Sequence, residues 1–457
     1  MDIYKRLAQI VGQDFVSNQP EEMYIYSMDP GTMPPSQPDY VVLPRHTQQV
    51  QKILHLANEQ ALPVYCMGAG LVLSGLTRPL QGGIVMDMKR MDCILEVNPQ
   101  SRYAVIEAGV TQGMLQAYLQ QHYPDLKHSM PDAPPMATIA GNVLIHGSGH
   151  LSQAGFHSEM LNGLEVVLPT GEVCRTGACS VSPYWLSRAP LPDLSGLFLG
   201  WSGTTGVATK LAIKLYPNYP YNDVAILVNQ DVELMPDILY KITHTQLAED
   251  LMAWMTPVPQ WAKGYQHLNI HFGAQSRQEL IWKRNLLQAS VQKYRDQKVA
   301  GFMMLPSFMR ERFLEVPDKG LARFADVKKG GGFEYVGGIM PTSSFPQAYQ
   351  LGLDIAREFE TAYSLGSRIV GPGHCMMFFY AYAFNRADPA DMQRAHQALQ
   401  KTNQEVLNMG GIPWKAEEPA QKQILNRMDP GSLELMNRVR SLLDPQGIMG
   451  PGNWEPE

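Results

Sequence analysis

The first half of the chain alternates between stretches with the period of a strand and stretches with the period of a helix. Short runs rich in β-branched and aromatic residues predict strands; these are YVVLP, LPVYCMG, GGIVMDM and YAVIEAG. Apolar residues at helical spacing behind a capping Thr predict two helices; these are TQQVQKILHLANEQ and TQGMLQAYLQQHY. LNGLEVVLPTGEVCRTG predicts a hairpin, and GVATKLAIKLYP predicts a strand that ends at Pro217. We therefore expect a first domain over residues 1–217.

The pattern changes after residue 217. Longer amphipathic stretches, ELIWKRNLLQASVQKYRDQ and FPQAYQLGLDIAREFETAYS, are interleaved with the strand-like runs EYVGGIM and MMFFYAYAF. This mixture predicts a second α+β domain over residues 218–425. Residues 426–457 contain a last predicted helix, GSLELMNRVRSLL, and the Gly- and Pro-rich stretch DPQGIMGPGNW.

Composition narrows the class of protein. The chain has 457 residues, enough for two or three domains, with 45% hydrophobic and 18% charged residues and a net charge of −6. It has no basic stretch that would indicate nucleic acid as a partner, and no apolar run long enough to span a membrane. Its five cysteines are scattered and follow no zinc-binding spacing, so we expect reduced thiols, no metal and a cytoplasmic protein. Export together with a partner subunit is left open.

Three loops of small residues indicate where a ligand binds. PVYCMGAGLVLSG, residues 63–75, places glycines behind a strand, where backbone N–H groups can approach a pyrophosphate because no Cβ intervenes. The spacing fits neither the GxGxxG nor the Walker pattern, so a simple tight turn is the alternative. Similar loops follow in PDAPPMATIAGNVLIHGSGH, residues 131–150, and GWSGTTGVAT, residues 200–209. Three such loops in one domain favour an extended dinucleotide.

The order of these segments resembles the vanillyl-alcohol oxidase / p-cresol methylhydroxylase superfamily. The resemblance runs through ALPVYCMGAG, GGIVMDMKRMDCIL, TIAGNV, GLEVVLPTGEV and GTTGVATKLAIKLYP, and RVRSLLDPQGIMGPGNW is similar to the family's last segment. It implies an α+β protein of two domains. A PCMH-type FAD-binding domain would be followed by a cap domain with an antiparallel sheet, and residues 426–457 would return to the first domain.

The resemblance also implies which residues contact FAD. By position these are, for the pyrophosphate, Gly68, Ala69, Gly70 and Leu71; for the ribityl and pyrophosphate region, Pro131, Ile139, Gly141 and Asn142; and beside the flavin or adenine, Gly149, His150, Gly206 and Val207. Some members bind FAD covalently through a His or Tyr of the cap. Phe378 lies near that position and cannot form the bond, so we expect noncovalent FAD, although a register shifted by two would place Tyr380 there.

Candidate catalytic residues follow from the chemistry of hydride transfer. A cation is expected near the flavin N1–C2=O edge, where negative charge develops. Where phenol-oxidising members carry a Tyr-Arg pair, GGIPWKAEE gives Trp414 and Lys415, for which a core aromatic and a surface charge are the alternatives. Tyr380 and Tyr382 share one face of their predicted strand and are candidate substrate contacts, unless that face is core. His150 can accept a proton from a substrate hydroxyl, unless its role is structural.

The sequence therefore predicts an FAD-dependent oxidoreductase that takes a hydride from a benzylic or alcohol carbon of a small aromatic substrate. Electrons would pass to a cytochrome, to another carrier protein or to dioxygen, and we expect a homo-oligomer, most simply a dimer. One alternative is a D-2-hydroxy-acid dehydrogenase, but GPGHCMMF lacks the acidic residue and the Asn of that branch's metal motif. Another is a flavin-binding subunit of an assembly, with an inactive pocket.

Overall fold

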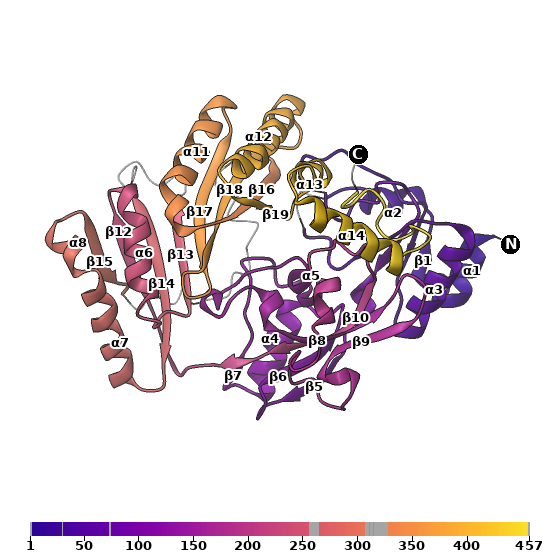
Figure 1. The fold of residues 1–457 in the computed structure, drawn as a ribbon, viewed down its shortest axis with the longest axis horizontal. Coiled ribbons are helices and arrows are strands. Elements are labelled where there is room, and N and C mark those ends of the chain that lie inside the picture. Colours follow the sequence, from indigo (N-terminus) through magenta and orange to yellow (C-terminus); the bar gives the residue numbers. More distant parts are fainter. Residues whose placement is uncertain are drawn as a thin grey trace.

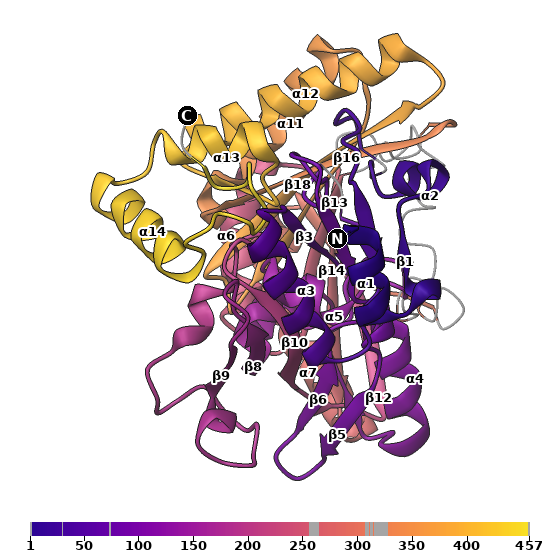
Figure 2. The same cartoon turned by 90° about the vertical axis from the view of Figure 1, so that its right-hand side faces the viewer.

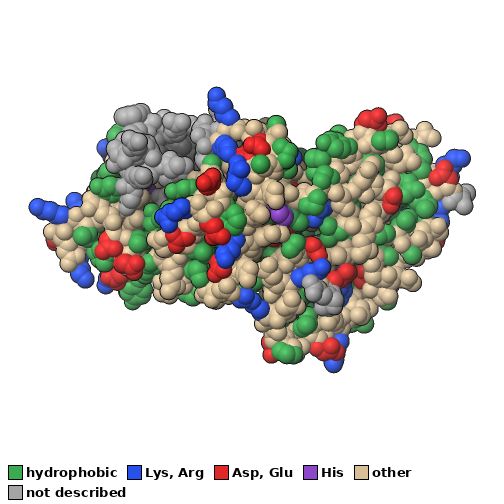
Figure 3. All heavy atoms as spheres, turned by 90° about the horizontal axis from the view of Figure 1, so that it is seen from above, with side chains coloured by type: hydrophobic (Ala, Val, Ile, Leu, Met, Phe, Trp, Pro, Cys, Tyr) green, Lys and Arg blue, Asp and Glu red, His purple; other side chains and the backbone are tan. Residues whose placement is uncertain are grey.

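The structure, a computed structural model, describes residues 2–29, 31–72, 75–255, 265–306, 310, 314 and 328–455. Two lobes lie side by side in Figure 1, one built from the first half of the chain and one from the second. Each lobe has its own hydrophobic core. Seen from above, the surface is hollowed where the lobes meet, and acidic and basic side chains are interspersed over this face (Figure 3).

A four-stranded sheet opens the first lobe, in the order β1-β2-β4-β3. Strands β2 and β3 both run parallel to β4, since α3 crosses between them, and α1 packs beside α3 (Figure 2). The apolar face of α3 is buried in the core, as its sequence period predicts. The elements are α1 (Ile3–Val11), β1 (Val16–Ser17), α2 (Pro20–Ile25), β2 (Tyr40–Val42), α3 (Thr47–Gln60), β3 (Val64–Met67) and β4 (Ile84–Asp87).

The second sheet of this lobe is antiparallel, in the order β5-β6-β10-β8-β9. The predicted hairpin is confirmed: β8 pairs with β9, and Gly171 N–H donates to the Leu168 carbonyl across the turn. The elements are β5 (Ile94–Asn98), β6 (Tyr103–Glu107), α4 (Gln112–His122), β7 (Leu126–Lys127), α5 (Ile139–Leu144), β8 (Leu161–Val167), β9 (Val173–Gly177), β10 (Val207–Lys214) and β11 (Tyr216–Pro217).

The second lobe, the cap, is built on an eight-stranded antiparallel sheet in the order β15-β12-β14-β13-β17-β18-β16-β19. Residues of α6, α7, α11 and α12 pack on one face of it and form the second core. The cap strands are β12 (Tyr221–Asn229), β13 (Asp250–Met255), β14 (Gln266–Ala274), β15 (Ala300–Met304), β16 (Gly331–Met340), β17 (Ala362–Val370), β18 (Cys375–Asn385) and β19 (Ile412–Trp414). The cap helices are α6 (Met235–Thr243), α7 (Arg277–Ser290), α8 (Gln292–Asp296), α11 (Phe345–Glu358) and α12 (Pro389–Asn408).

The chain then returns to the first lobe through α13 (Glu418–Leu425) and α14 (Pro430–Leu443) (Figure 1). Ile448 and Met449 belong to the core of the first lobe. Val64 N–H donates to the Ile448 carbonyl (2.7 Å), and Gly450 N–H donates to the Val64 carbonyl (2.8 Å). This segment therefore covers β3, the edge strand that leads into the first glycine loop. In the described part of the chain, no helix is both long and apolar enough to cross a membrane.

Candidate functional site

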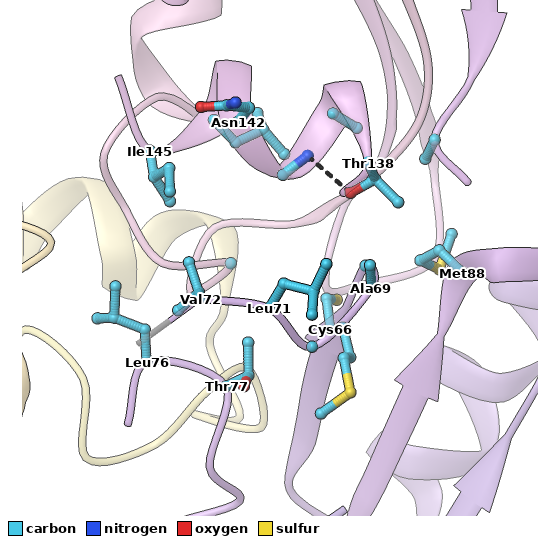
Figure 4. Close-up of a pocket in the computed structure, with 18 of the residues that line it drawn as sticks. Cys66, Ala69, Leu71, Val72, Leu76, Thr77, Met88, Thr138, Asn142 and Ile145 are labelled. Atoms are coloured by element: carbon cyan, nitrogen blue, oxygen red, sulfur yellow. Dashed lines mark hydrogen bonds between the residues drawn. The ribbon is translucent and has the colours of Figure 1, made fainter. Parts of the chain in front are cut away.

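A cleft runs along the first lobe and ends at the cap. It contains about 1170 Å³ of atom-free space, its open mouth included. One wall is the loop after β3, a second is the start of α5, and a third is formed by residues 202–208; Lys415 of the cap lines it as well. Figure 4 shows Ala69, Leu71 and Val72 facing Thr138 and Asn142 across this space. The cleft is therefore made from the same three small-residue loops that the sequence indicates.

Glycine is needed where the first two walls approach each other. A Cβ on Gly68 would lie 2.3 Å from the Thr138 hydroxyl oxygen, far inside van der Waals contact. That hydroxyl accepts a hydrogen bond from Gly141 N–H (3.3 Å) and caps α5, so it cannot move aside freely. Gly70 has φ +65°, a left-handed conformation that favours glycine. The walls thus present backbone rather than side chains, which fits the polar backbone of a dinucleotide.

The first glycine loop is held at its far end by the N-terminal segment. Asp29 accepts hydrogen bonds from Gly31 N–H (2.9 Å) and Gly75 N–H (2.5 Å). Arg78 donates to the Pro34 carbonyl (2.5 Å). Burial raises the pKa of Asp29, which these N–H donors partly oppose. Residues 73 and 74 of the predicted loop lie outside the described residues.

Eight of the residues predicted to contact FAD line the cleft: Gly68, Ala69, Gly70, Leu71, Gly141, Asn142, Gly206 and Val207. Ile139 lies under them in the hydrophobic core, at the start of α5. Pro131, Gly149 and His150 belong to two segments that run together, since His150 N–H donates to the Met130 carbonyl (2.8 Å). These last three are not among the residues lining this cleft, and their contact with FAD stays a prediction.

Lys415 places a cation in the cleft. No described Asp or Glu side chain forms an ion pair with its ammonium group, which lies 4.1 Å from the centre of the Trp414 ring. Burial lowers the pKa of Lys415 to about 8. Its φ of +56° is a left-handed backbone conformation that costs a residue other than glycine about 1–2 kcal/mol. A strained and half-buried cation without an ion-pair partner among the described residues fits a site where an anionic group binds.

Trp414 connects the cap to the first lobe and belongs to an aromatic wall. Its indole N–H donates to the Ile145 carbonyl (2.7 Å), just after α5. Tyr335 of β16 packs edge-on against Trp414 (ring centres 6.0 Å apart) and stacks on Phe379 of β18 (5.7 Å). We call Tyr335, Phe379 and Trp414 the aromatic wall. Burial raises the pKa of Tyr335, so its hydroxyl stays protonated.

Tyr380 and Tyr382 lie on the opposite face of the same sheet. Both are fully buried in the core between the sheet and the cap helices, and the Tyr382 hydroxyl lies 2.6 Å from Thr402 of α12. Phe378 is buried on this face too. The sequence correctly predicts that these residues share a face, but that face is core. We therefore drop Tyr380 and Tyr382 from the candidate site, and Tyr380 also from any covalent link to FAD.

His150 belongs to a network of charged groups that joins the lobes. Its Nε2 lies 3.1 Å from Asp132, and Arg368 of β17 bonds both Asp132 (2.7 Å) and Asp250 of β13 (3.0 Å). His150 also lines a second cavity, together with Lys127, His128, Glu249 and His271. Sequence reasoning missed Tyr335, Asp132 and Arg368. A single charge inside the otherwise uncharged run SLGSRIV, residues 364–370, is the available signal for Arg368.

Among the described residues, one group of side chains could ligate a metal ion: Asp92, Cys93 and Glu107. Arg45 occupies this group, pairing with Asp92 at 2.6 Å and reaching the Cys93 sulfur at 3.6 Å. The guanidinium supplies the positive charge that a metal would bring. The expectation of no metal stays a prediction.

Two families of domains match the sequence. The FAD binding domain family matches residues 38–177, and the C-terminal domain family of FAD linked oxidases matches residues 323–454. An FAD-linked oxidoreductase of Mycobacterium tuberculosis is 25% identical over 92% of each chain. The flavoprotein subunit of 4-cresol dehydrogenase (hydroxylating) of Pseudomonas putida is 23% identical over 98% of this chain and 94% of its own. The glycolate oxidase subunit GlcD of Bacillus subtilis is 32% identical over 47% of this chain and 45% of its own.

Solved structures share the whole fold. p-Cresol methylhydroxylase with substrate bound superposes with a TM-score of 0.86 at 18% identity, over 100% of this chain and 96% of its own. 4-Ethylphenol oxidase from Gulosibacter chungangensis, in complex with isoeugenol, gives 0.84 at 19% identity, over 100% and 97%. The predicted fold class, a PCMH-type FAD-binding domain with an antiparallel cap, is confirmed. The chain therefore carries an FAD binding domain and the C-terminal domain of FAD linked oxidases; it is an FAD-linked oxidoreductase, and FAD is its cofactor.

Proposed function

We propose that this FAD-dependent oxidoreductase removes a hydride from a benzylic or alcohol carbon of a small aromatic substrate. The observation that carries the proposal is the aromatic wall beside the unpaired ammonium of Lys415, at the end of the FAD cleft. An aromatic ring packs well against Tyr335 and Phe379, and a phenolate or other developing negative charge is stabilised by a nearby cation.

The walls of the cleft would hold FAD without a covalent link. The loops that contain Gly68 and Gly141 would face its pyrophosphate and ribityl regions with backbone groups. When bound, FAD supplies the acceptor for the substrate's hydride. The side chains of the cap then decide which substrate carbon is presented to it.

Lys415 would stabilise negative charge, and His150 would accept a proton. The Lys415 ammonium stabilises negative charge with single hydrogen bonds, because it lacks the bidentate fork of a guanidinium. His150, held against Asp132, accepts the proton of a substrate hydroxyl through its imidazole. Trp414 has no group that exchanges protons, so its part is to pack against substrate and to fix the neighbouring Lys415.

A D-2-hydroxy acid is the second candidate substrate. Its support is the 32% identity with the GlcD subunit of Bacillus subtilis glycolate oxidase, which covers less than half of either chain. Lys415 can pair with a carboxylate as well as with a phenolate. The similarity to the 4-cresol dehydrogenase flavoprotein subunit covers 98% of this chain and supports the aromatic substrate.

The remaining partners are proposals as well. The Pseudomonas putida relative is named as a subunit, which supports transfer of the electrons to a cytochrome or another carrier protein; dioxygen is the alternative. A homodimer and a cytoplasmic location stay predictions.

Anaerobic reduction of the FAD-bound protein tests the proposal. We expect 4-alkylphenols or vanillyl-type alcohols to bleach the flavin absorbance, and D-lactate and glycolate to leave it unchanged. Bleaching by the hydroxy acids alone would support the second candidate. Stable yellow protein that none of these compounds reduces would contradict both and favour an inactive subunit. Acid precipitation should release the flavin into the supernatant; flavin that stays in the pellet would contradict the noncovalent link.

A further inference from the structure

Four side chains form a continuous line of contacts across the boundary between the lobes. His150 and Asp132 come from the first lobe, and Arg368 and Asp250 come from cap strands β17 and β13. His150 Nε2 lies 3.1 Å from Asp132 Oδ1, and Asp132 Oδ2 accepts a hydrogen bond from Arg368 Nη2 (2.7 Å). Arg368 in turn donates to both carboxylate oxygens of Asp250, at 3.0 and 3.1 Å.

Burial changes along this line. Arg368 and Asp250 are almost fully buried, with 4% and 1% of their side chains exposed, whereas Asp132 and His150 are 23% and 25% exposed. The buried end is a bidentate ion pair, the geometry in which a guanidinium is held most rigidly. The accessible end is a histidine that faces a cavity. The fixed end is therefore positioned to orient the accessible one.

Arg368 remains charged in this line of contacts. Burial lowers its pKa, but Asp250 and Asp132 raise it further, so that the net shift is upward. The Asp132 carboxylate therefore lies between a permanent cation and His150, where it can stabilise a protonated imidazole. The line is thus suited to a histidine that gains a proton during the reaction.

Among the described residues, Asp132 is the carboxylate that contacts His150. His271 of β14 lies edge-on to it, with ring centres 5.9 Å apart, and burial lowers the pKa of His271 to about 4. Burial also lowers the pKa of His157 to about 3. Lys127 and Glu249 line the same cavity but pair with each other at 2.9 Å. Near pH 7 these neighbours bring no unbalanced charge.

We propose that Arg368 is a positioning residue for His150: it holds Asp132 in place and sets, through Asp132, the strength with which His150 accepts a proton. The proposal rests on the proposed function, in which His150 takes the proton of a substrate hydroxyl. It adds that the base of the first lobe is tuned by an arginine of the cap. Correct docking of the two lobes then becomes a condition for proton transfer.

The test compares the pH dependence of flavin bleaching in variants along the line. Asp132→Asn removes the carboxylate beside His150, which destabilises the protonated imidazole and should move the acid limb of the pH–rate profile to lower pH. Arg368→Gln removes one cationic partner of Asp132, which strengthens the attraction of Asp132 for the protonated imidazole and should move the acid limb to higher pH. We expect shifts of about one pH unit in these opposite directions. Arg368→Lys keeps the positive charge but loses the bidentate geometry of the guanidinium. It should lower the rate of flavin bleaching about tenfold and move the acid limb of the pH–rate profile little.

A control variant separates tuning from loss of structure. Arg284 of α7 pairs with the buried Asp223 of β12 at 2.6 Å, elsewhere in the cap. Arg284→Gln likewise removes a close cation from a buried carboxylate, although Arg310 stays 3.8 Å from Asp223, and it should lower thermal stability without moving the acid limb. Should Arg368→Gln fail to fold, Arg368→Lys still decides: an unchanged rate in that variant would overturn the proposal, because a lysine cannot hold Asp132 and Asp250 in the same fork. Unchanged pH limbs in both Asp132→Asn and Arg368→Gln would overturn the proposal.

A second measurement does not depend on the substrate. NMR titration of the histidine ring protons in FAD-bound protein, with the His150 signal assigned by its loss in His150→Gln, reports the pKa of His150 directly. We expect a lower value in Asp132→Asn and a higher one in Arg368→Gln; equal values in all proteins would overturn the proposal. If no substrate bleaches the flavin while these shifts occur, the proposed function fails and the role of Arg368 stands.

Discussion

The two sides of the site are built in different ways. In the first lobe the cleft is lined by backbone, and close approach at Gly68 and Thr138 decides its shape. In the cap the candidate site consists of side chains: the aromatic wall, on one face of a sheet whose other face is core, and Lys415, directly after β19. We therefore expect FAD binding to depend on the lack of a Cβ at positions such as Gly68. We expect substrate choice to depend on which face of the cap sheet is turned toward the first lobe.

Removal of the cation should give the largest effect. Lys415→Met takes away the ammonium in the cleft, and we expect bleaching to slow on the order of 100-fold because developing charge is no longer stabilised. Lys415→Arg is the matched control and should recover part of the rate. Stopped-flow reduction under anaerobic conditions measures both. An unchanged rate in Lys415→Met would remove this residue from the site.

A side chain added to the backbone wall should weaken FAD binding. Gly68→Val would place its Cβ against Thr138, and we expect roughly 10- to 100-fold weaker binding from the strain. Gly196→Ala is the control, because a Cβ there meets no atom within 4 Å. Titration of FAD into the FAD-free variants, followed by flavin fluorescence, gives the dissociation constants. Equal affinities would show that this wall does not contact the cofactor.

The pH dependence of the free energy of unfolding tests whether the Lys415 ammonium group is shielded from water. Its pKa in the folded protein is lowered to about 8 from an ordinary 10.5, so between these values the folded state binds fewer protons than the unfolded state. The cost of burying the ammonium is thus complete below pH 8 and fades as the pH rises. In FAD-free protein, Lys415→Met should raise the melting temperature at pH 7, and the gain should shrink by pH 10. Lys415→Arg, which stays charged, should show no such convergence with Lys415→Met.

The smallest effects should come from the core face of β18. Tyr382→Phe removes the contact with Thr402 and should cost about 1 kcal/mol of unfolding free energy. Tyr380→Phe should cost nothing measurable, since its buried hydroxyl has no hydrogen-bond partner among the described residues. Both should keep the wild-type KM, whereas Tyr335→Leu on the opposite face should raise it about tenfold. A changed KM in Tyr382→Phe would contradict the assignment of the two faces.

The helices α3 and α4 of the first lobe are predicted well from the spacing of their apolar residues. Thr111 caps α4 as expected, since its hydroxyl accepts a hydrogen bond from Met114 N–H (3.2 Å). The other predicted cap was wrong: α3 begins at Thr47 itself, and the Thr47 hydroxyl donates to Glu165 of β8 instead. Both helices form because the spacing of apolar residues along the chain is enough to specify a helix. The residue that a single hydroxyl contacts in the folded protein cannot be inferred from that spacing.

The cap site could be predicted only in part, for a related reason. Alternation along β18 shows that Tyr380 and Tyr382 share a face, but both faces of this strand are apolar and aromatic. Which face meets the first lobe depends on where α11 and α12 pack, and the sequence of one strand does not contain that information. Lys415 and Trp414 are predicted from the sequence because a motif marks them. Tyr335 and Arg368 carry no motif, and their roles depend on contacts with residues more than 200 positions away or on neighbouring strands.

The pairing of Val64 with residues 448–450 has a consequence for how the protein is made. Strand β3, which leads into the cofactor loop, leaves the ribosome about 385 residues before the segment that covers its edge. At typical rates of synthesis this strand waits roughly 20–80 s with unpaired backbone groups, a state open to wrong pairing with another nascent chain. Productive folding of the cofactor cleft thus waits until residues 448–450 have been made. A chaperone, or FAD itself, has that interval in which to protect it.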